Sequence, residues 1–197
     1  MATIGLDNLY YAAITEDIDG METYGTPTKM AGAVSVELSI ELNEGNFYSD
    51  DKLSAAVKEF KSGSITLAVD DIGSSVASVL VGASVDDNGV LIHAGEDSAS
   101  PVAVGFRAKM PNGKYRYFWL YRVLFGVPST SLATKGDSIT FSNPSIAGVI
   151  MLRNKADLEG KHPWKSEITE GETEADATTI ASWFTEVYEP SYTNGDV

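Results

Sequence analysis

Residues 102–125 read VAVGFRAKMPNGKYRYFWLYRVLF, and this stretch decides the fold. Asn112-Gly113 favours a tight hairpin turn because both residues tolerate positive φ, and the residues on either side alternate as they do in strands. This alternation places six aromatic or apolar side chains on one face of the second strand: Tyr115, Tyr117, Trp119, Tyr121, Val123 and Phe125. We therefore predict a hairpin whose aromatic face packs in the core of a β-sandwich.

The same hairpin concentrates positive charge in an acidic chain. The formal net charge of the protein is −14, yet five of its fourteen cations lie here: Arg107, Lys109, Lys114, Arg116 and Arg122. These charges form a candidate surface for acidic groups on a neighbouring subunit. They could instead be satisfied within the subunit, and the sequence leaves both interpretations open.

Length and composition limit the class of protein. A chain of 197 residues can bury one full core, so we expect a single domain over 1–197. It has no cysteine, which excludes disulfides and thiolate metal sites. The 28 acidic residues disfavour tight binding of nucleic acid, whose phosphates require cations. The apolar runs are too short to cross a membrane, and the N-terminus lacks the basic region of a signal peptide, so a soluble protein made in the cytoplasm is expected.

Further strand patterns indicate a mainly β chain. Residues 33–42 alternate without a break, residues 64–70 repeat the pattern, and Asn88-Gly89 joins two short runs as a second hairpin. Further strands are expected at 6–14, 139–141 and 146–152. The fold class predicted is an antiparallel β-sandwich or barrel.

Two segments favour helix. Thr173 and Asp176 have capping-box spacing, and apolar residues then recur at helical intervals, which predicts a C-terminal helix over about 174–188. Residues 72–82 favour a shorter helix, although a buried strand fits this length as well. The last residues, 190–197, are short and polar and are expected to form a loose tail.

Residues 43–63, NEGNFYSDDKLSAAVKEFKSG, form a connection between two strands that is longer than usual within a compact domain. We interpret it as an inter-strand arm. It combines aromatic and charged side chains that suit a partner-binding strip: Phe47, Tyr48, Asp50, Asp51, Lys52, Lys58 and Phe60. The alternative is a loop folded onto its own core.

The sequence contains no recognisable catalytic motif. His93 and His162 have no metal-ligand spacing, and the pairs Asp50-Asp51, Asp70-Asp71 and Asp86-Asp87 are typical of turns rather than of calcium loops. There is no phosphate-binding glycine loop and no nucleophile elbow. We therefore predict neither an enzyme nor a metal or cofactor site. The aromatic hairpin could provide a stacking platform for sugars or single-stranded nucleic acid, but a core role is favoured.

Six stretches, taken in order, resemble the major tail proteins of bacteriophages with long non-contractile tails, the phi-thirteen-type family. They are IGLDNLYYA (4–12), AGAVSVELSIELNEGNFYSDDK (31–52), KEFKSGSITLAVDD (58–71), VGFRAKMPNGKYRYFWLYRVLFGVPS (104–129), ATKGDSITF (133–141) and KHPWKSEITEGETEADATTIASWF (161–184). The resemblance spans residues 1 to about 190.

This resemblance implies a structural protein of the virion tail, a β-sandwich with a flanking helix, assembled in the host cytoplasm into stacked hexameric rings that form the tail tube. Its implied partners are further copies of itself, other tail proteins at the tube ends and the tape measure protein in the lumen. Genome DNA would pass through without specific binding, which suits an acidic chain. The subunit interface is expected to use the strip on the arm together with Arg107, Lys109, Arg116 and Arg122. The alternative function is a monomeric carbohydrate-binding β-sandwich.

Overall fold

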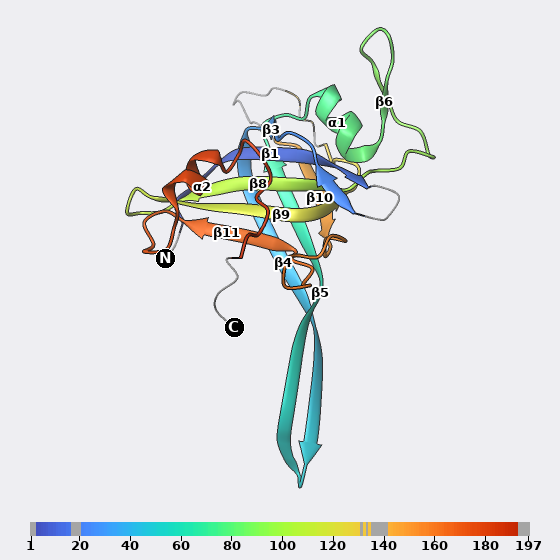
Figure 1. Ribbon diagram of the computed structural model, residues 1–197. Coiled ribbons are helices and arrows are strands. Elements are labelled where there is room, and N and C mark those ends of the chain that lie inside the picture. Colours follow the sequence, from blue (N-terminus) through green and yellow to red (C-terminus); the bar gives the residue numbers. More distant parts are fainter. Residues whose placement is uncertain (1–2, 17–20, 131, 133, 135–141, 193–197) are drawn as a thin grey trace.

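The computed structural model describes residues 3–16, 21–130, 132, 134 and 142–192 (Figure 1). Over these residues the chain is mainly antiparallel β with two short helices, as the sequence predicts. In chain order the elements are β1 (Gly5–Glu16), β2 (Glu22–Tyr24), β3 (Thr28–Ala31), β4 (Ala33–Ser49), β5 (Lys52–Val69), α1 (Ser74–Val81), β6 (Ser84–Val85), β7 (Leu91–Ile92), β8 (Val102–Lys109), β9 (Tyr115–Phe125), β10 (Ser145–Ile150), β11 (Lys165–Thr169) and α2 (Ala177–Ser182). The strand expected at 139–141 lies outside the described residues.

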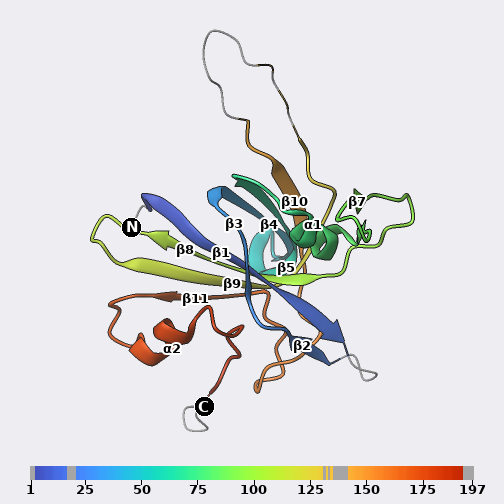
Figure 2. The same ribbon diagram turned by 90° about the horizontal axis from the view of Figure 1, so that it is seen from above.

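The described strands form one curled sheet and one small hairpin. The sheet has the order β2-β1-β8-β9-β10-β5-β4, with β3 added to β1 and β11 added to β9, while β6 and β7 pair separately. The sheet curls until β4 contacts β1, but in the described part of the chain these two strands do not pair (Figure 2). The result is a barrel-like fold with an open seam between β1 and β4.

Two apolar cores lie on opposite sides of this sheet. The first lies inside the curl and is built from β1, β5, β8, β9, β10 and α1, with Leu67, Val104 and Leu120 fully buried. The second lies between the outer face of β9 and the C-terminal segment, where Trp119 and Tyr121 pack against Trp183 and Val187. Burying both faces of β9 explains why its sequence is aromatic and apolar almost throughout.

A β-bulge in β9 corrects the predicted arrangement of its aromatic face. The pairing with β8 passes from Val104↔Leu120 to Val102↔Val123, so β9 holds one extra residue at this point. Before the bulge, Tyr117 and Trp119 face the second core; after it, Val123 and Phe125 face the first. The bulge also divides the edge of β9 that faces away from β8. This edge pairs with β11 over 116–120 and with β10 over 123–125.

The hairpin between β8 and β9 is confirmed, but its turn is not the two-residue type that Asn112-Gly113 suggests. Only Gly113 has positive φ, at 84°, and the Met110 amide donates to the Lys114 carbonyl at 2.8 Å across a wider turn. The β6–β7 hairpin closes in the same way, with Gly89 at φ 80° and the Asp86 amide bonded to the Val90 carbonyl at 3.0 Å. Backbone hydrogen bonds from Val90 and Asn88 to Asp86 lower the pKa of that carboxyl, which confirms its role in a turn.

The two helices differ in how closely they follow the prediction. Residues 74–81 are helical rather than a buried strand. The C-terminal helix is shorter than predicted, covering Ala177–Ser182 instead of 174–188, and its N-cap is Asp176, whose Oδ2 accepts from the Thr179 amide at 2.8 Å. The following residues, with helical apolar spacing, pack on the second core without remaining in the helix: Trp183, Phe184, Val187 and Tyr188.

Candidate subunit interface

The arm is a regular two-stranded ribbon that extends the barrel strands. β4 and β5 are 17 and 18 residues long, and their pairing continues beyond the barrel to Ser49↔Lys52 (Figure 1). The turn consists of Asp50 and Asp51, with φ of 50° and 56°, and positive φ at both central residues is the mark of a type I′ hairpin turn. The predicted arm is therefore present, but as a continuous hairpin rather than an irregular connection.

The arm does not fold back onto the core. Every described side chain from 41 to 59 is exposed, including Phe47 at 63% and Val57 at 55%. The cross-strand pairs Phe47↔Ala55 and Gly45↔Val57 place these apolar groups on one side of the ribbon, which we call the apolar face of the arm. The opposite side carries Tyr48 and the ion pair of Lys58 Nζ with Glu44 Oε1, at 2.6 Å.

The structure separates the predicted arm residues into a tip and a base. Phe47, Tyr48, Asp50, Asp51 and Lys52 lie together at the tip, and no ion pair engages the last three among the described residues. Phe60 lies instead at the base, partly buried, where its ring stacks on Trp164 with centroids 5.1 Å apart. Phe60 therefore contributes to the packing of its own subunit.

The cations of the β8–β9 hairpin divide in a similar way. Arg107 holds Asp7 through two contacts, Nε–Oδ1 at 2.5 Å and Nη2–Oδ2 at 3.2 Å, and these hydrogen bonds raise the pKa of the guanidinium. Arg122 pairs with Glu16 and Glu22. These two arginines are thus satisfied within the subunit. Lys109, Lys114 and Arg116 form no ion pair with any described residue, and Arg116 Nε donates to Thr169 Oγ1 at 3.1 Å.

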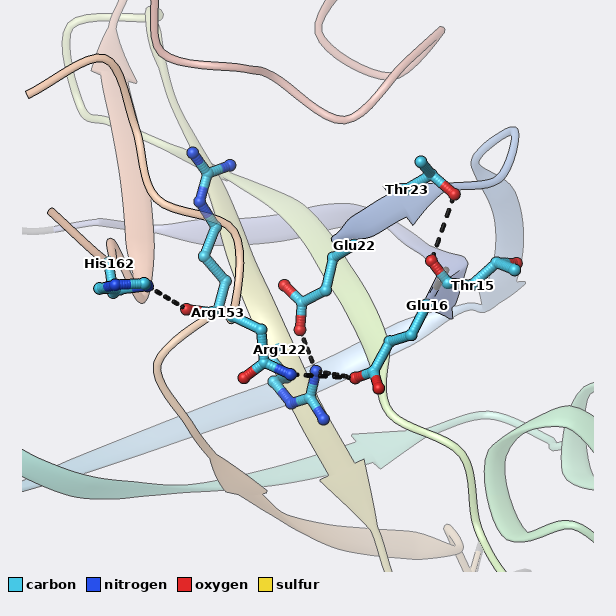
Figure 3. A network of polar contacts seen from close by, with 8 residues as sticks. Thr15, Glu16, Glu22, Thr23, Arg122, Arg153 and His162 are labelled. Atoms are coloured by element: carbon cyan, nitrogen blue, oxygen red, sulfur yellow. Dashed lines mark hydrogen bonds and ion pairs between the residues drawn. The ribbon is translucent and has the colours of Figure 1, made fainter. Parts of the chain in front are cut away.

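A network of charged side chains, of which Glu22 and Arg153 are buried, lies where β2 and the C-terminal segment meet β9 (Figure 3). Arg122 lies between Glu22, which is fully buried, and Glu16, whose Oε1 is 2.5 Å from Arg122 Nη1. Nearby, the almost fully buried Arg153 donates from Nη1 to Glu189 Oε2 at 2.9 Å. The sequence carries no signal for these pairs, because their members are far apart along the chain.

Arg153 also connects the network to the second core and to a loop. Its guanidinium lies over the Tyr121 ring, 4.9 Å from the centroid, and burial raises the pKa of Tyr121 to about 12. The Arg153 carbonyl oxygen is 2.9 Å from Nδ1 of His162, which places that histidine in a loop contact. The network therefore fixes the C-terminal segment against the sheet.

The aromatic row of β9 is not available to a ligand. Trp119 and Tyr121 are fully buried, and Tyr117 is almost so, beneath the segment that follows α2. The hairpin therefore provides no stacking platform for sugar or nucleic acid. Among residues 3–16, 21–130 and 142–192, no three His, Asp or Glu side chains form a group suited to a metal ion.

None of the described helices has the length and apolar character needed to cross a membrane.

The comparisons with known proteins give structural likenesses but no match by sequence. No family model matches the chain, and no curated protein matches it. The fold is similar to a chain of the anti-feeding prophage cap, the AFP tube terminating cap, with a TM-score of 0.48 and 7% sequence identity over 86% of this chain and 93% of that one. A likeness of this size leaves function to be argued from the residues of the chain itself.

Proposed function

We propose that this protein is the major subunit of a bacteriophage tail tube, which self-assembles into stacked hexameric rings. The sequence resemblance supports this function, and one structural observation carries it furthest. That observation is the arm, a long hairpin whose apolar side chains are not covered by their own subunit.

The exposed arm is difficult to explain in a monomer. Phe47 and Val57 expose more than half of their surface on a ribbon that stands clear of the barrel. An isolated two-stranded ribbon is only marginally stable in water, and exposed apolar groups gathered on one face are typical of a protein–protein contact. Burial against another subunit would remove this apolar surface from water and hold the ribbon in place.

The arm also suits an assembly of rings. Where the arm meets a surface of a second copy other than that copy's own arm, the contact joins two different surfaces. Such heterologous contacts close into rings when the rotation permits, and they continue into stacks when it does not. A tube of stacked rings uses both kinds of contact.

The charge of the chain suits a conduit for genome DNA. A net charge of −14 leaves few cations to neutralise phosphates, and surplus carboxylates at a lumen would repel the duplex. DNA would then pass during ejection without specific binding. On this proposal the other partners are the tail proteins at the tube ends and the tape measure protein in the lumen.

The experiment that tests this function shortens the arm without breaking the hairpin. Glu44 and Lys58 face each other across the ribbon and form an ion pair, so replacing residues 45–57 with Asn-Gly provides a favoured turn for the shortened strands. We expect the intact protein to form rings and tubes by negative-stain electron microscopy, and the shortened protein to stay folded and monomeric. An intact protein that remains monomeric at all concentrations would contradict the proposed function, and normal tubes from the shortened protein would contradict the role of the arm.

A further inference from the structure

The open seam of the barrel contains an apolar groove. Where β4 approaches β1 without pairing, a groove of about 350 Å³ is lined by Leu6, Val36, Leu38, Phe106 and Phe118, together with Val34 at its edge. Leu38 exposes 40% of its surface although it pairs with the buried Ile65 on the inward side of β4, and Val34, at a bulge between Ala33 and Ser35, exposes 51%. We call this surface the seam groove.

The seam groove ends at unpaired positive charge. Arg116 lies two residues before Phe118 in β9, on the same side of the sheet. Arg116 and Lys114 both line a second pocket next to the groove. No described carboxylate forms an ion pair with either cation. Glu170 and Glu172 line the adjoining pocket as well, and Glu170 Oε2 already accepts a hydrogen bond from the Tyr115 amide at 3.1 Å.

The arm tip has the complementary chemistry. Its apolar face presents Phe47 and Val57, and its turn presents Asp50 and Asp51, which no described cation pairs. The type I′ turn does not need these charges, because Asn-Gly satisfies the same positive φ angles better. The tip cannot occupy the groove of its own subunit, because the ribbon carries it about 25 Å beyond Leu42, at ~3.3 Å per residue, and away from the barrel (Figure 1).

We propose that the seam groove of one subunit receives the arm tip of a second copy. The apolar face of the arm covers Leu38 and Phe118, and the carboxylates of Asp50 and Asp51 lie against Arg116 and Lys114. This inference rests on the proposed function, since it assigns the receiving surface for the arm. It explains why the seam stays open: a closed barrel would leave the arm no apolar groove to enter.

Cross-linking of native residues tests the contact directly. A carbodiimide joins a carboxylate to an amine only when the two groups touch, and Lys114 is the amine of the receiving site. In assembled protein we expect mass spectrometry to identify a link between the peptide of Asp50–Asp51 and that of Lys114, and no link from the tip to Lys29, which is exposed and has no ion pair with a described residue. Links from Lys114 to another acidic segment of the second copy would assign the groove to that segment and overturn the proposal.

Charge changes provide the second test. The variant Asp50→Asn with Asp51→Gly keeps an optimal turn and removes both charges, and Lys114→Glu with Arg116→Glu reverses the receiving site. We expect each to raise the concentration needed for tube growth about tenfold or more, as for central interface contacts. Combined, they should lose much less than the product of the two effects, while Lys29→Glu alone changes nothing. Independent effects in the combined variant would overturn the contact while leaving the tube itself established by the intact protein.

Discussion

Trp119 Nε1 donates a hydrogen bond of 2.9 Å to the backbone carbonyl oxygen of Trp183. The donor belongs to β9 in the middle of the sheet, and the acceptor belongs to the residue that caps α2. Both indoles are buried in the second core. This bond therefore joins the C-terminal segment to the sheet in a place where water cannot replace a lost partner.

Replacing Trp119 with Phe should cost about 2–4 kcal/mol of unfolding free energy, because the change opens a cavity and leaves the Trp183 carbonyl without its donor. Urea unfolding measures this loss. Trp183→Phe is the matched control, since its own Nε1 is 3.4 Å from the Phe118 carbonyl and contributes a weaker bond. An equal loss in both variants would show that cavity size, rather than the hydrogen bond, dominates.

Gly105 should not tolerate a methyl group. A Cβ at this position of β8 would lie 2.7 Å from Cη2 and Cζ3 of the Trp119 ring, which is fully buried. We expect Gly105→Ala to lower the unfolding free energy by about 1–3 kcal/mol through overpacking. Gly45→Ala on the arm provides the control. No atom of the described residues lies within 4 Å of the new Cβ, so the melting temperature of this variant should stay unchanged.

Replacing Arg122 should lower the unfolding free energy more than replacing its buried partner Glu22 does. Arg122→Met leaves the Glu22 carboxylate buried without its cation, which costs about 3 kcal/mol or more. Glu22→Gln removes that buried charge and leaves Arg122 paired with Glu16, so its loss should be smaller. Calorimetry of both variants and of the combined variant measures the coupling, and simple addition of the two losses would argue against a direct interaction.

Asp176 should make the stability of the C-terminal segment depend on pH. Hydrogen bonds from the hydroxyl and amide of Thr179 hold the pKa of this carboxyl below its ordinary value of 3.8. The folded state therefore takes up a proton less readily than the unfolded state, so the contribution is complete above pH 3.8 and is lost as the pH falls through the lowered pKa. Asp176→Asn keeps a neutral cap. The melting temperature of the native protein should exceed that of the variant near neutral pH, and the difference should shrink in acid.

The features that local pattern determines were predictable from sequence. The strands around Asn112-Gly113 and the helix from Ser74 follow from alternation and apolar spacing, and the structure confirms both. The course of β9 was not predictable, because a bulge depends on the register with β8, and one extra residue moves Val123 and Phe125 to the other core.

The candidate site was predictable only where local sequence pattern determines its structure. A long connection with Phe47 and Tyr48 indicated an arm, but both of its faces are exposed, so its strands lack the alternation that reveals a half-buried strand. Its Asp50-Asp51 turn also lacks the usual Asn-Gly signature. The internal pairing of Arg107 and Arg122 depends on partners about one hundred residues away in sequence, which no local pattern encodes.

The unbroken course of β4 and β5 has a mechanical consequence. A pull on the tip acts along the axes of these strands and reaches the barrel through the ladder between β5 and β10, which runs from Ala68↔Ser145 to Gly63↔Ile150. Force applied in this direction shears the whole ladder at once, so its hydrogen bonds share the load instead of separating one after another. The arm is therefore firmly anchored in the barrel, and tension at its tip is carried into strands that border the first core.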